Sequence, residues 1–304
     1  MSVMPIVRFL LLLGCCASIA ASAKGVDRVW IQPPRPTSTE SDWYPRSIEV
    51  REGRVILFDG KQLRVICTGD EAETVIASGR VIWIEPDPVS DLEQEAVDLF
   101  EQGEHAASLL RLPDILKQRP PVWRQQRITM LSAVNAWLSG RASIALELVG
   151  QLDRRPLPLA VVAWLPIAWE NGALSTETLE AAKNRLEDPS PAVRLVAASW
   201  LLSASDRNQA ITTLKSLEQH PRVEIARLAE VLLWRITAPP QVADLATQWQ
   251  ARLDALPMAL QTGPTKTVIN KLRAAGQSER ADQLKWSLEV TPIQPSFDRP
   301  RSSK

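Results

Sequence analysis

The chain is poor in the residues that most often build metal sites and catalytic centres. Its 304 residues include only two histidines, three cysteines and one tyrosine. Metal sites draw mainly on clusters of histidine and cysteine, and His105 and His220 each lack a second histidine nearby in the sequence. No Walker A loop, nucleophile elbow or zinc-protease helix occurs either. We therefore expect no catalytic residues, no metal and no cofactor, and predict that the protein is not an enzyme.

An excess of charge of one sign is also missing. Lys plus Arg and Asp plus Glu both count 35. Affinity for nucleic acid comes largely from an excess of positive charge, so the balance argues against a nucleic-acid partner.

Long hydrophobic runs are absent too. Beyond the N-terminal leader no segment reaches ~18 uninterrupted apolar residues, and we expect no transmembrane segment.

The first 23 residues have the features of a secretory signal peptide. Arg8 precedes a short apolar core, and residues 21–23 (Ala-Ser-Ala) supply small side chains at the −3 and −1 positions. Cleavage after Ala23 is predicted, which places the mature chain in the periplasm of a bacterium or outside the cell. Residues 12–15 (Leu-Leu-Gly-Cys) also resemble a lipoprotein box, so a lipid anchor at Cys15 is the alternative.

Residues 24–86 are predicted to form a small β domain. Short runs rich in Val and Ile occupy residues 46–50, 54–58, 62–67, 73–77 and 80–85, and Glu52-Gly53 and Asp59-Gly60 are among the turn pairs between them. Asp-Gly suits a type I′ turn, because both central residues need positive φ. About five short strands in ~60 residues predict a small barrel or curled meander, similar in size to SH3-like barrels. Cys67 alternates with Leu63 and Val65, which predicts a buried, inert thiol.

From residue 87 to about 290 the sequence predicts helices throughout. Ser90 and Ser175 are predicted helix caps, and the stretch 159–169 predicts the most buried helix because it is apolar nearly all round. Two later segments then repeat one apolar pattern at offsets i, i+3, i+4, i+7 and i+8: Val193, Val196, Ala197, Trp200 and Leu201, then Ile225, Leu228, Ala229, Leu232 and Leu233. An amphipathic helix used twice predicts that neighbouring units stack into a solenoid.

The first of these segments carries a family resemblance. Residues 188–198 (Asp-Pro-Ser-Pro-Ala-Val-Arg-Leu-Val-Ala-Ala) resemble the HEAT and HEAT-like repeats, whose second helix commonly opens with an aspartate, a proline, a Val-Arg pair and an alanine. The unit that begins at His220 departs from this pattern, because Ala226 stands where the arginine is expected. Residues 96–110 are predicted to form a helix, a turn at Gln102-Gly103-Glu104 and a second helix, and this pair resembles a degenerate tetratricopeptide unit. For residues 87–290 these resemblances imply a right-handed α-solenoid of HEAT/TPR-like helix pairs. With the β domain that precedes it, the chain is predicted to have an α+β multidomain fold. Residues 291–304 are predicted to be a disordered tail.

Tryptophan is the one aromatic residue in abundance, with 11 copies against 4 Phe. Trp43, Trp83 and Trp123 lie outside the repeated apolar stripes, and they are the candidate interaction residues because Trp is enriched in interface hot spots.

The leading hypothesis is an exported, non-enzymatic scaffold that binds a protein partner through its solenoid surface. The alternative is an accessory protein that binds carbohydrate or another envelope polymer through the Trp residues of the β domain. A hydrolase built from scattered carboxylates is the third hypothesis.

Overall fold

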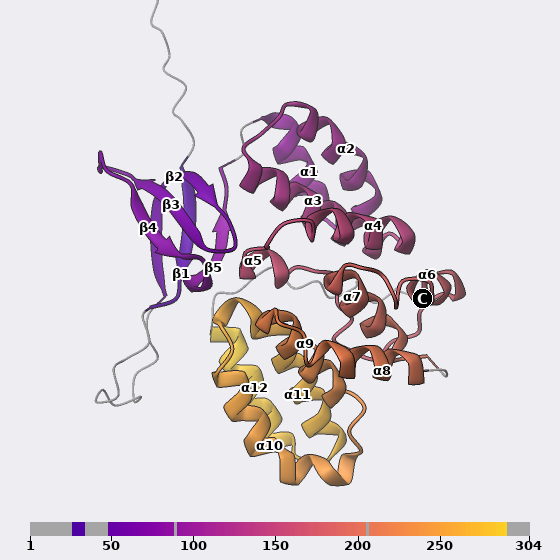
Figure 1. Cartoon of the computed structure of the whole chain (residues 1–304). Helices are drawn as coiled ribbons and strands as arrows, with labels where there is room; N and C mark the ends of the chain where they lie inside the picture. The colour runs from indigo at the N-terminus through magenta and orange to yellow at the C-terminus, as the bar shows by residue number, and fades with distance from the viewer. Residues whose placement is uncertain (1–25, 34–47, 88–89, 205–206, 291–304) are drawn as a thin grey trace, which may run out of the picture.

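The computed structural model describes residues 26–33, 48–87, 90–204 and 207–290. Within these ranges a five-stranded antiparallel sheet precedes a long series of helices, which confirms the α+β class (Figure 1). No helix in the described ranges has both the length and the apolar character that a membrane span requires. The predicted signal peptide, Cys15, Trp43 and the tail at residues 291–304 lie outside the described residues.

The sheet is open. Its strands are β1 (Asp27–Ile31), β2 (Glu49–Phe58), β3 (Gln62–Cys67), β4 (Thr74–Ala77) and β5 (Val81–Glu85). They lie in the order β4-β3-β2-β1-β5. The predicted barrel is therefore wrong, because β4 and β5, which would have to pair to close it, form opposite edges of the described sheet. Strand β1 separates β2 from β5, so the strands that follow one another in sequence do not simply curl round into a closed ring.

Two glycines explain where the turn predictions failed. Gly53 was expected in a turn but lies inside β2, where an added Cβ would collide with the backbone of Ile66 on β3. The β2–β3 turn does exist, yet Gly60 does not have the positive φ that a type I′ turn needs. Instead the carboxylate of Asp59 accepts hydrogen bonds from the backbone N–H groups of Lys61 (2.8 Å) and Gln62 (2.9 Å). Gly53 thus marks a close approach of two strands, whereas Gly60 lies in a turn held by Asp59, where an added Cβ would come within 3.1 Å of Pro156.

The core of the sheet is completed by helices. Its buried residues come from all five strands: Val29, Ile31, Val55, Phe58, Leu63, Val65, Cys67, Ile76, Val81 and Ile84. Trp123 and Ala160, both from the helical part, belong to the same cluster. Cys67 is a buried free thiol, as predicted. The apolar face of the sheet is thus covered by helices rather than by a second sheet.

Twelve α-helices are found in the described residues. They are α1 (Asp91–Glu101), α2 (His105–Lys117), α3 (Val122–Leu138), α4 (Ala142–Leu152), α5 (Leu159–Val162), α6 (Thr176–Lys183), α7 (Pro191–Leu201), α8 (Asn208–Leu217), α9 (Val223–Trp234), α10 (Pro239–Asp254), α11 (Thr262–Ala274) and α12 (Ser278–Val290). The hydroxyl groups of Ser90 and Ser175 cap α1 and α6 as predicted. In α7 and α9 the repeated apolar stripes face the core, and Trp200 is fully buried. Neighbouring helices pack in sequence order along much of the chain, so a helical repeat arrangement is plausible.

Residues 159–169 depart most from the prediction. They are largely buried, but only α5 is helical, because Pro166 has no N–H to donate and disfavours helical backbone at the residue before it. Three helices hold this segment through side chains that bond to its carbonyls. Trp200 of α7 donates to Pro166 (2.7 Å), Arg235 beyond α9 donates to Ala168 (2.6 Å), and Thr267 of α11 donates to Trp169 (3.0 Å).

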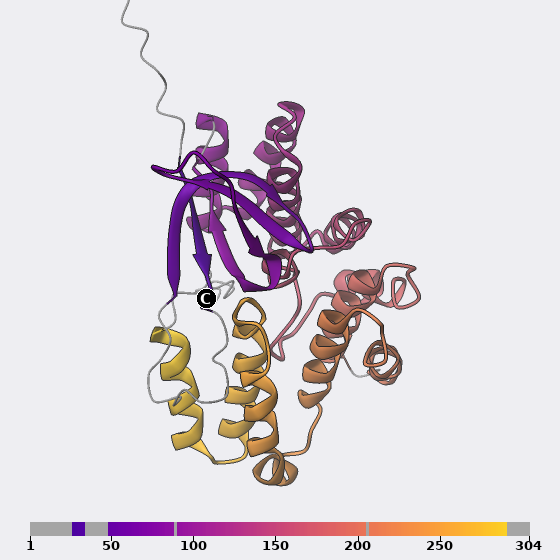
Figure 2. The ribbon, with the colours of Figure 1, turned by 60° about the vertical axis from the view of Figure 1, so that its left-hand side comes forward.

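The C-terminal helices return to the sheet. A short 3-10 helix, η2 (Met258–Leu260), contacts both β5 and α5. The backbone N–H of Met258 donates to the side chain of Gln32, just beyond β1, over 3.0 Å. Figure 2 shows these helices below the sheet, on the side where β1 ends. The sheet therefore contacts both the first and the last part of the helical region.

Candidate functional site: the cavity between sheet and helices

The structure places the candidate tryptophans in different environments. Trp123, at the start of α3, is 5% exposed and belongs to the core of the sheet. Trp83 of β5 is half-buried, and its ring stacks on Trp164 with centroids 4.5 Å apart and an interplanar angle of 11°. Trp43 lies outside the described residues. The described tryptophans of this set therefore do not form an exposed row, and Trp83 is the one that lines a cavity.

A cavity of about 340 Å³ lies where β5 meets α1 and α3. Its lining residues come from β5 and the residue after it, from α1, from α3 and from Trp164: Trp83, Glu85, Pro86, Glu93, Gln94, Val97, Phe100, Glu101, Arg127, Met130, Leu131 and Trp164. We call this the junction cavity. Apolar side chains form much of its wall, and acidic side chains stand beside them. Such a mixture is typical of ligand sites, in which apolar side chains contact the apolar part of the ligand and a few polar groups orient it.

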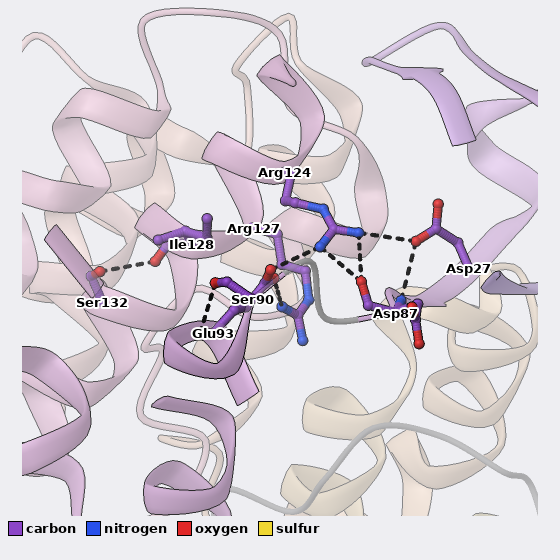
Figure 3. A network of polar contacts seen from close by, with 8 residues as sticks. All are labelled: Asp27, Asp87, Ser90, Glu93, Arg124, Arg127, Ile128 and Ser132. Atoms are coloured by element: carbon purple, nitrogen blue, oxygen red, sulfur yellow. Dashed lines mark hydrogen bonds and ion pairs between the residues drawn. The ribbon is translucent and has the colours of Figure 1, made fainter. Parts of the chain in front are cut away.

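A network of buried ion pairs lies next to the junction cavity. The guanidinium of Arg124 on α3 donates to Glu93 of α1 (2.8 Å), to Asp27 of β1 (3.1 Å) and twice to the carbonyl of Asp87 (2.9 Å each). Figure 3 shows Arg124 between the two carboxylates. All three charged side chains are at most 7% exposed. The network thus joins the sheet, the first helix and the third helix at one point.

Asp27 has further partners in this network. Its carboxylate accepts hydrogen bonds from the backbone N–H groups of Val55 (3.0 Å) and Asp87 (3.2 Å). Burial raises the pKa of Asp27, whereas the bond from Val55 and the charge of Arg124 act to lower it. Asp27 lies on the buried face of β1, so this carboxylate depends on its donors to remain in the core.

Arg127 extends the network into the cavity. Its guanidinium lies 3.7 Å from Glu93 and 5.9 Å from the ring centroid of Trp83, and its side chain is 15% exposed. Burial lowers the pKa of Arg127 to about 10, and the charge of Glu93 acts in the opposite direction. At neutral pH the side chain is therefore protonated. Two arginines then face the carboxylates of Asp27 and Glu93, so the buried network is neutral.

The entrance of the junction cavity carries further negative charge. Glu85 and Glu101 line the cavity and are exposed. Glu85 has a partner in Arg28, but at 3.8 Å, and both side chains are 54% exposed, so water screens this pair strongly. We call Glu85 and Glu101 the acidic rim. Because the network beneath them is neutral, the rim gives the cavity a negative bias.

The aromatic rings of the cavity are already packed against other groups. Trp164 and the guanidinium of Arg127 both lie over the ring of Trp83. Phe100 contacts Trp164 at a centroid distance of 6.3 Å, and His105 contacts Phe100 at 5.5 Å. A sugar that stacks on Trp83 would compete with these two neighbours for the ring. The cavity is therefore better suited to a ligand that contacts ring edges and aliphatic groups.

Neither histidine lines the junction cavity. His105 begins α2, is half-buried and contacts the side-chain oxygen of Asn135 through Nδ1 (3.1 Å). Burial lowers its pKa. His220 accepts a hydrogen bond from the backbone N–H of Arg222 through Nδ1 (3.2 Å), which is a turn-stabilising role. In the described part of the chain no group of three His, Cys, Asp or Glu residues is arranged to hold a metal ion.

Little of this site could be predicted from the sequence. Ser90 was predicted to cap α1, but nothing in the sequence indicated that the carboxylate of Glu93, three residues later, bonds to Arg124. Asp27 and Arg124 are 97 positions apart in the chain, and neither belongs to a recognisable motif. Comparison with protein-family models, with curated proteins and with solved structures finds no match to this chain, so the geometry of the junction cavity is the basis for any functional assignment.

Proposed function

We propose that this protein is an exported, non-enzymatic binding protein, and that its junction cavity receives a positively charged side chain of a partner protein. The observation that carries the proposal is the distribution of charge in the cavity. The network of Asp27, Glu93, Arg124 and Arg127 is neutral, while the rim is acidic. A lysine or arginine side chain would place its apolar stem against the cavity wall and its charge at the rim.

The size of the cavity supports a side chain as the ligand. About 340 Å³ is near the lower end of the ~300–1,000 Å³ found for small-molecule pockets. Val97, Phe100 and Met130 offer aliphatic and aromatic contacts for the stem, and Glu101 is an exposed acceptor at the end of α1. Glu93 bonds to Arg124 and lies close to Arg127, which leaves it poorly placed to act as a general acid. These features favour binding over hydrolysis.

The helices would provide the surrounding surface for the partner, as a HEAT-like solenoid. The arrangement of the repeated units supports this part of the proposal. Asp153, at the end of α4, accepts a hydrogen bond from Ser190 before α7 (2.6 Å) and another from Arg222 before α9 (2.5 Å). The starts of the two matching helices therefore meet at one side chain, as stacked units of a repeat would. We propose that export follows from the signal peptide at residues 1–23.

Carbohydrate binding is the second candidate. Polar side chains that commonly contact sugars, including Gln94 and Arg127, line the cavity beside Trp83. Against it stands the packing of Trp83, whose ring is already covered by Trp164 and Arg127. A cell-wall glycan fragment would therefore bind only after these side chains rearrange.

The proposal can be tested with the mature chain, residues 24–304, and three short peptides that differ at one central position. Calorimetry should detect binding of the peptide with lysine, about tenfold weaker binding with norleucine, and none with glutamate. Val97→Phe should abolish binding by filling the cavity, and Glu101→Gln should weaken it about fivefold. Glu95→Gln, on the same helix but paired with Arg111 away from the cavity, is the matched control.

Two results would count against the proposal. Equal affinity for the lysine and glutamate peptides would show that the acidic rim does not select the ligand. Unchanged binding in Val97→Phe would show that the peptide binds elsewhere. Binding of soluble cell-wall glycan fragments that is lost in Val97→Phe, without peptide binding, would establish the carbohydrate alternative.

A further inference from the structure

A second pocket, of about 470 Å³, lies where the segment after α5 meets the ends of α7 and α9 and the start of α8. It is lined by Asn171, Gly172, Ala173, Leu202, Ser203, Ala204, Arg207 and Arg235. Two of these described lining residues are arginines and none is a carboxylate. The described lining of this pocket therefore carries positive charge, unlike the acidic rim of the junction cavity, and the inference drawn from it is independent of the proposed function.

Arg235 is a buried cation whose hydrogen-bond partners are all uncharged groups. Its side chain donates to the carbonyls of Ala168 (2.6 Å), Ser199 (2.8 Å) and Glu170 (3.0 Å), and to the side chains of Asn171 and Ser203 (2.9 Å each). The residue is only 5% exposed, and its Nε has no hydrogen-bond partner. The partners solvate the guanidinium but do not neutralise it.

The pKa shifts of Arg235 and of the nearby Lys271 agree with an excess of positive charge in this region. Burial lowers the pKa of Arg235 to about 10, and the exposed carboxylate of Glu170 offsets only part of that effect. Burial also lowers the pKa of Lys271, and the charges of Arg235 and Arg207 lower it further. Lys271 donates to the carbonyl of Thr237 (2.8 Å). Three cations therefore influence one region of the structure.

The start of α8 adds to this field. Arg207 is the N-cap residue of α8, is exposed, and makes no side-chain cap to the helix. The first N–H groups of a helix are unsatisfied donors, and the helix dipole places partial positive charge at this end. A negatively charged group in the pocket would meet Arg207, the field of Arg235 and this end of α8 together.

We propose that this pocket binds a doubly charged oxyanion, a phosphate or sulfate group. Arg207 is the exposed residue that contacts the anion, and buried Arg235 supplies a fixed positive charge behind it. The polar side chains of Asn171 and Ser203 line the same pocket. Its volume leaves room for a phosphate or sulfate together with part of the molecule that carries it.

The test uses the mature full-length chain with inorganic phosphate and inorganic sulfate, each compared with chloride at equal ionic strength. At saturation we expect the midpoint of thermal unfolding to rise by about 2–4 °C in either anion, because a ligand that binds only the folded state stabilises it. Titration followed by ³¹P line broadening should show saturable binding of phosphate. Competition by sulfate would show that the two anions share the site. A response to phosphate without one to sulfate would identify a phosphorylated ligand as the source.

Arg207→Gln should abolish both responses without lowering stability in chloride, since the side chain is exposed. Arg227→Gln removes an exposed arginine that pairs with Glu230 on α9, and it should behave like the wild type. The proposal is overturned if neither anion raises the midpoint above chloride. It is also overturned if Arg207→Gln responds as strongly as the wild type does.

Discussion

Replacing Arg124 with methionine should be among the most destabilising single changes in this protein. The substitution keeps an unbranched chain of similar length and removes the charge. Arg124 makes four hydrogen bonds, to Glu93, to Asp27 and twice to the carbonyl of Asp87, and all of them are lost. The carboxylates of Glu93 and Asp27, which are 2% and 7% exposed in the wild type, would then be buried without this cation.

Removing one partner of a buried ion pair costs ~3–5 kcal/mol, mainly because the other charge stays uncompensated. Here two features favour the lower end of that range. Arg127 still lies 3.7 Å from Glu93, and the N–H groups of Val55 and Asp87 still donate to Asp27. We therefore expect a loss of ~3 kcal/mol, a large part of the ~5–15 kcal/mol that folded proteins have in total.

Urea unfolding followed by tryptophan fluorescence measures this loss, because Trp123 precedes Arg124 and is buried in the sheet core. Arg111→Met is the control, since its pair with Glu95 is about half exposed and should contribute less than ~1 kcal/mol. Adding Asp27→Asn and Glu93→Gln to the Arg124→Met background should recover part of the stability by removing the buried charges. If Arg124→Met is no worse than Arg111→Met, the reasoning about this network is wrong.

The remaining predictions concern packing and use the same urea assay. Trp200→Ala should lower the free energy of unfolding by ~3–5 kcal/mol, because it empties a fully buried position and removes the hydrogen bond to the Pro166 carbonyl. His220→Ala should lower it by less than ~1 kcal/mol. The reverse order would contradict the proposed packing of the repeats. Gly263→Ala should destabilise the protein by ~1–3 kcal/mol, because the added Cβ would collide with the ring of Trp169. Gly150→Ala should stabilise the protein by ~0.5–1 kcal/mol, because alanine favours helix α4 and the added Cβ would lie 3.5 Å from Val193, an ordinary contact. Similar effects of the two substitutions would refute this difference.

Local patterns in the sequence predicted the helical units well. The five apolar offsets of α7 and α9 are properties of a single helix, so they could be found without knowledge of the fold. The serine caps at Ser90 and Ser175 are local as well. Helical periodicity failed at residues 163–169, where a continuous apolar stretch has no preferred face and Pro166 stops the helix.

The closure of the sheet could not be predicted from its strands. Their lengths and turns suit either a barrel or an open sheet, and the outcome depends on what covers the apolar face. In this protein Trp123 and Ala160 cover it, and both come from segments that the sequence assigned to the helical domain. The candidate site could not be predicted from the sequence for a related reason. Its charged residues lie on β1, α1 and α3, and no spacing within one segment reveals that they meet.

The same geometry determines which residues can test binding. Asp27 and Arg124 lie next to the junction cavity and Glu93 lines it, and these three residues hold the sheet to the helices, so changing them alters folding and binding together. Val97 and Glu101 face the cavity and belong to no buried ion pair in the described network. Loss of binding in variants of these two residues, at unchanged stability, would therefore report on the ligand site itself. A binding defect in an Arg124 variant would report first on the stability of the junction between sheet and helices.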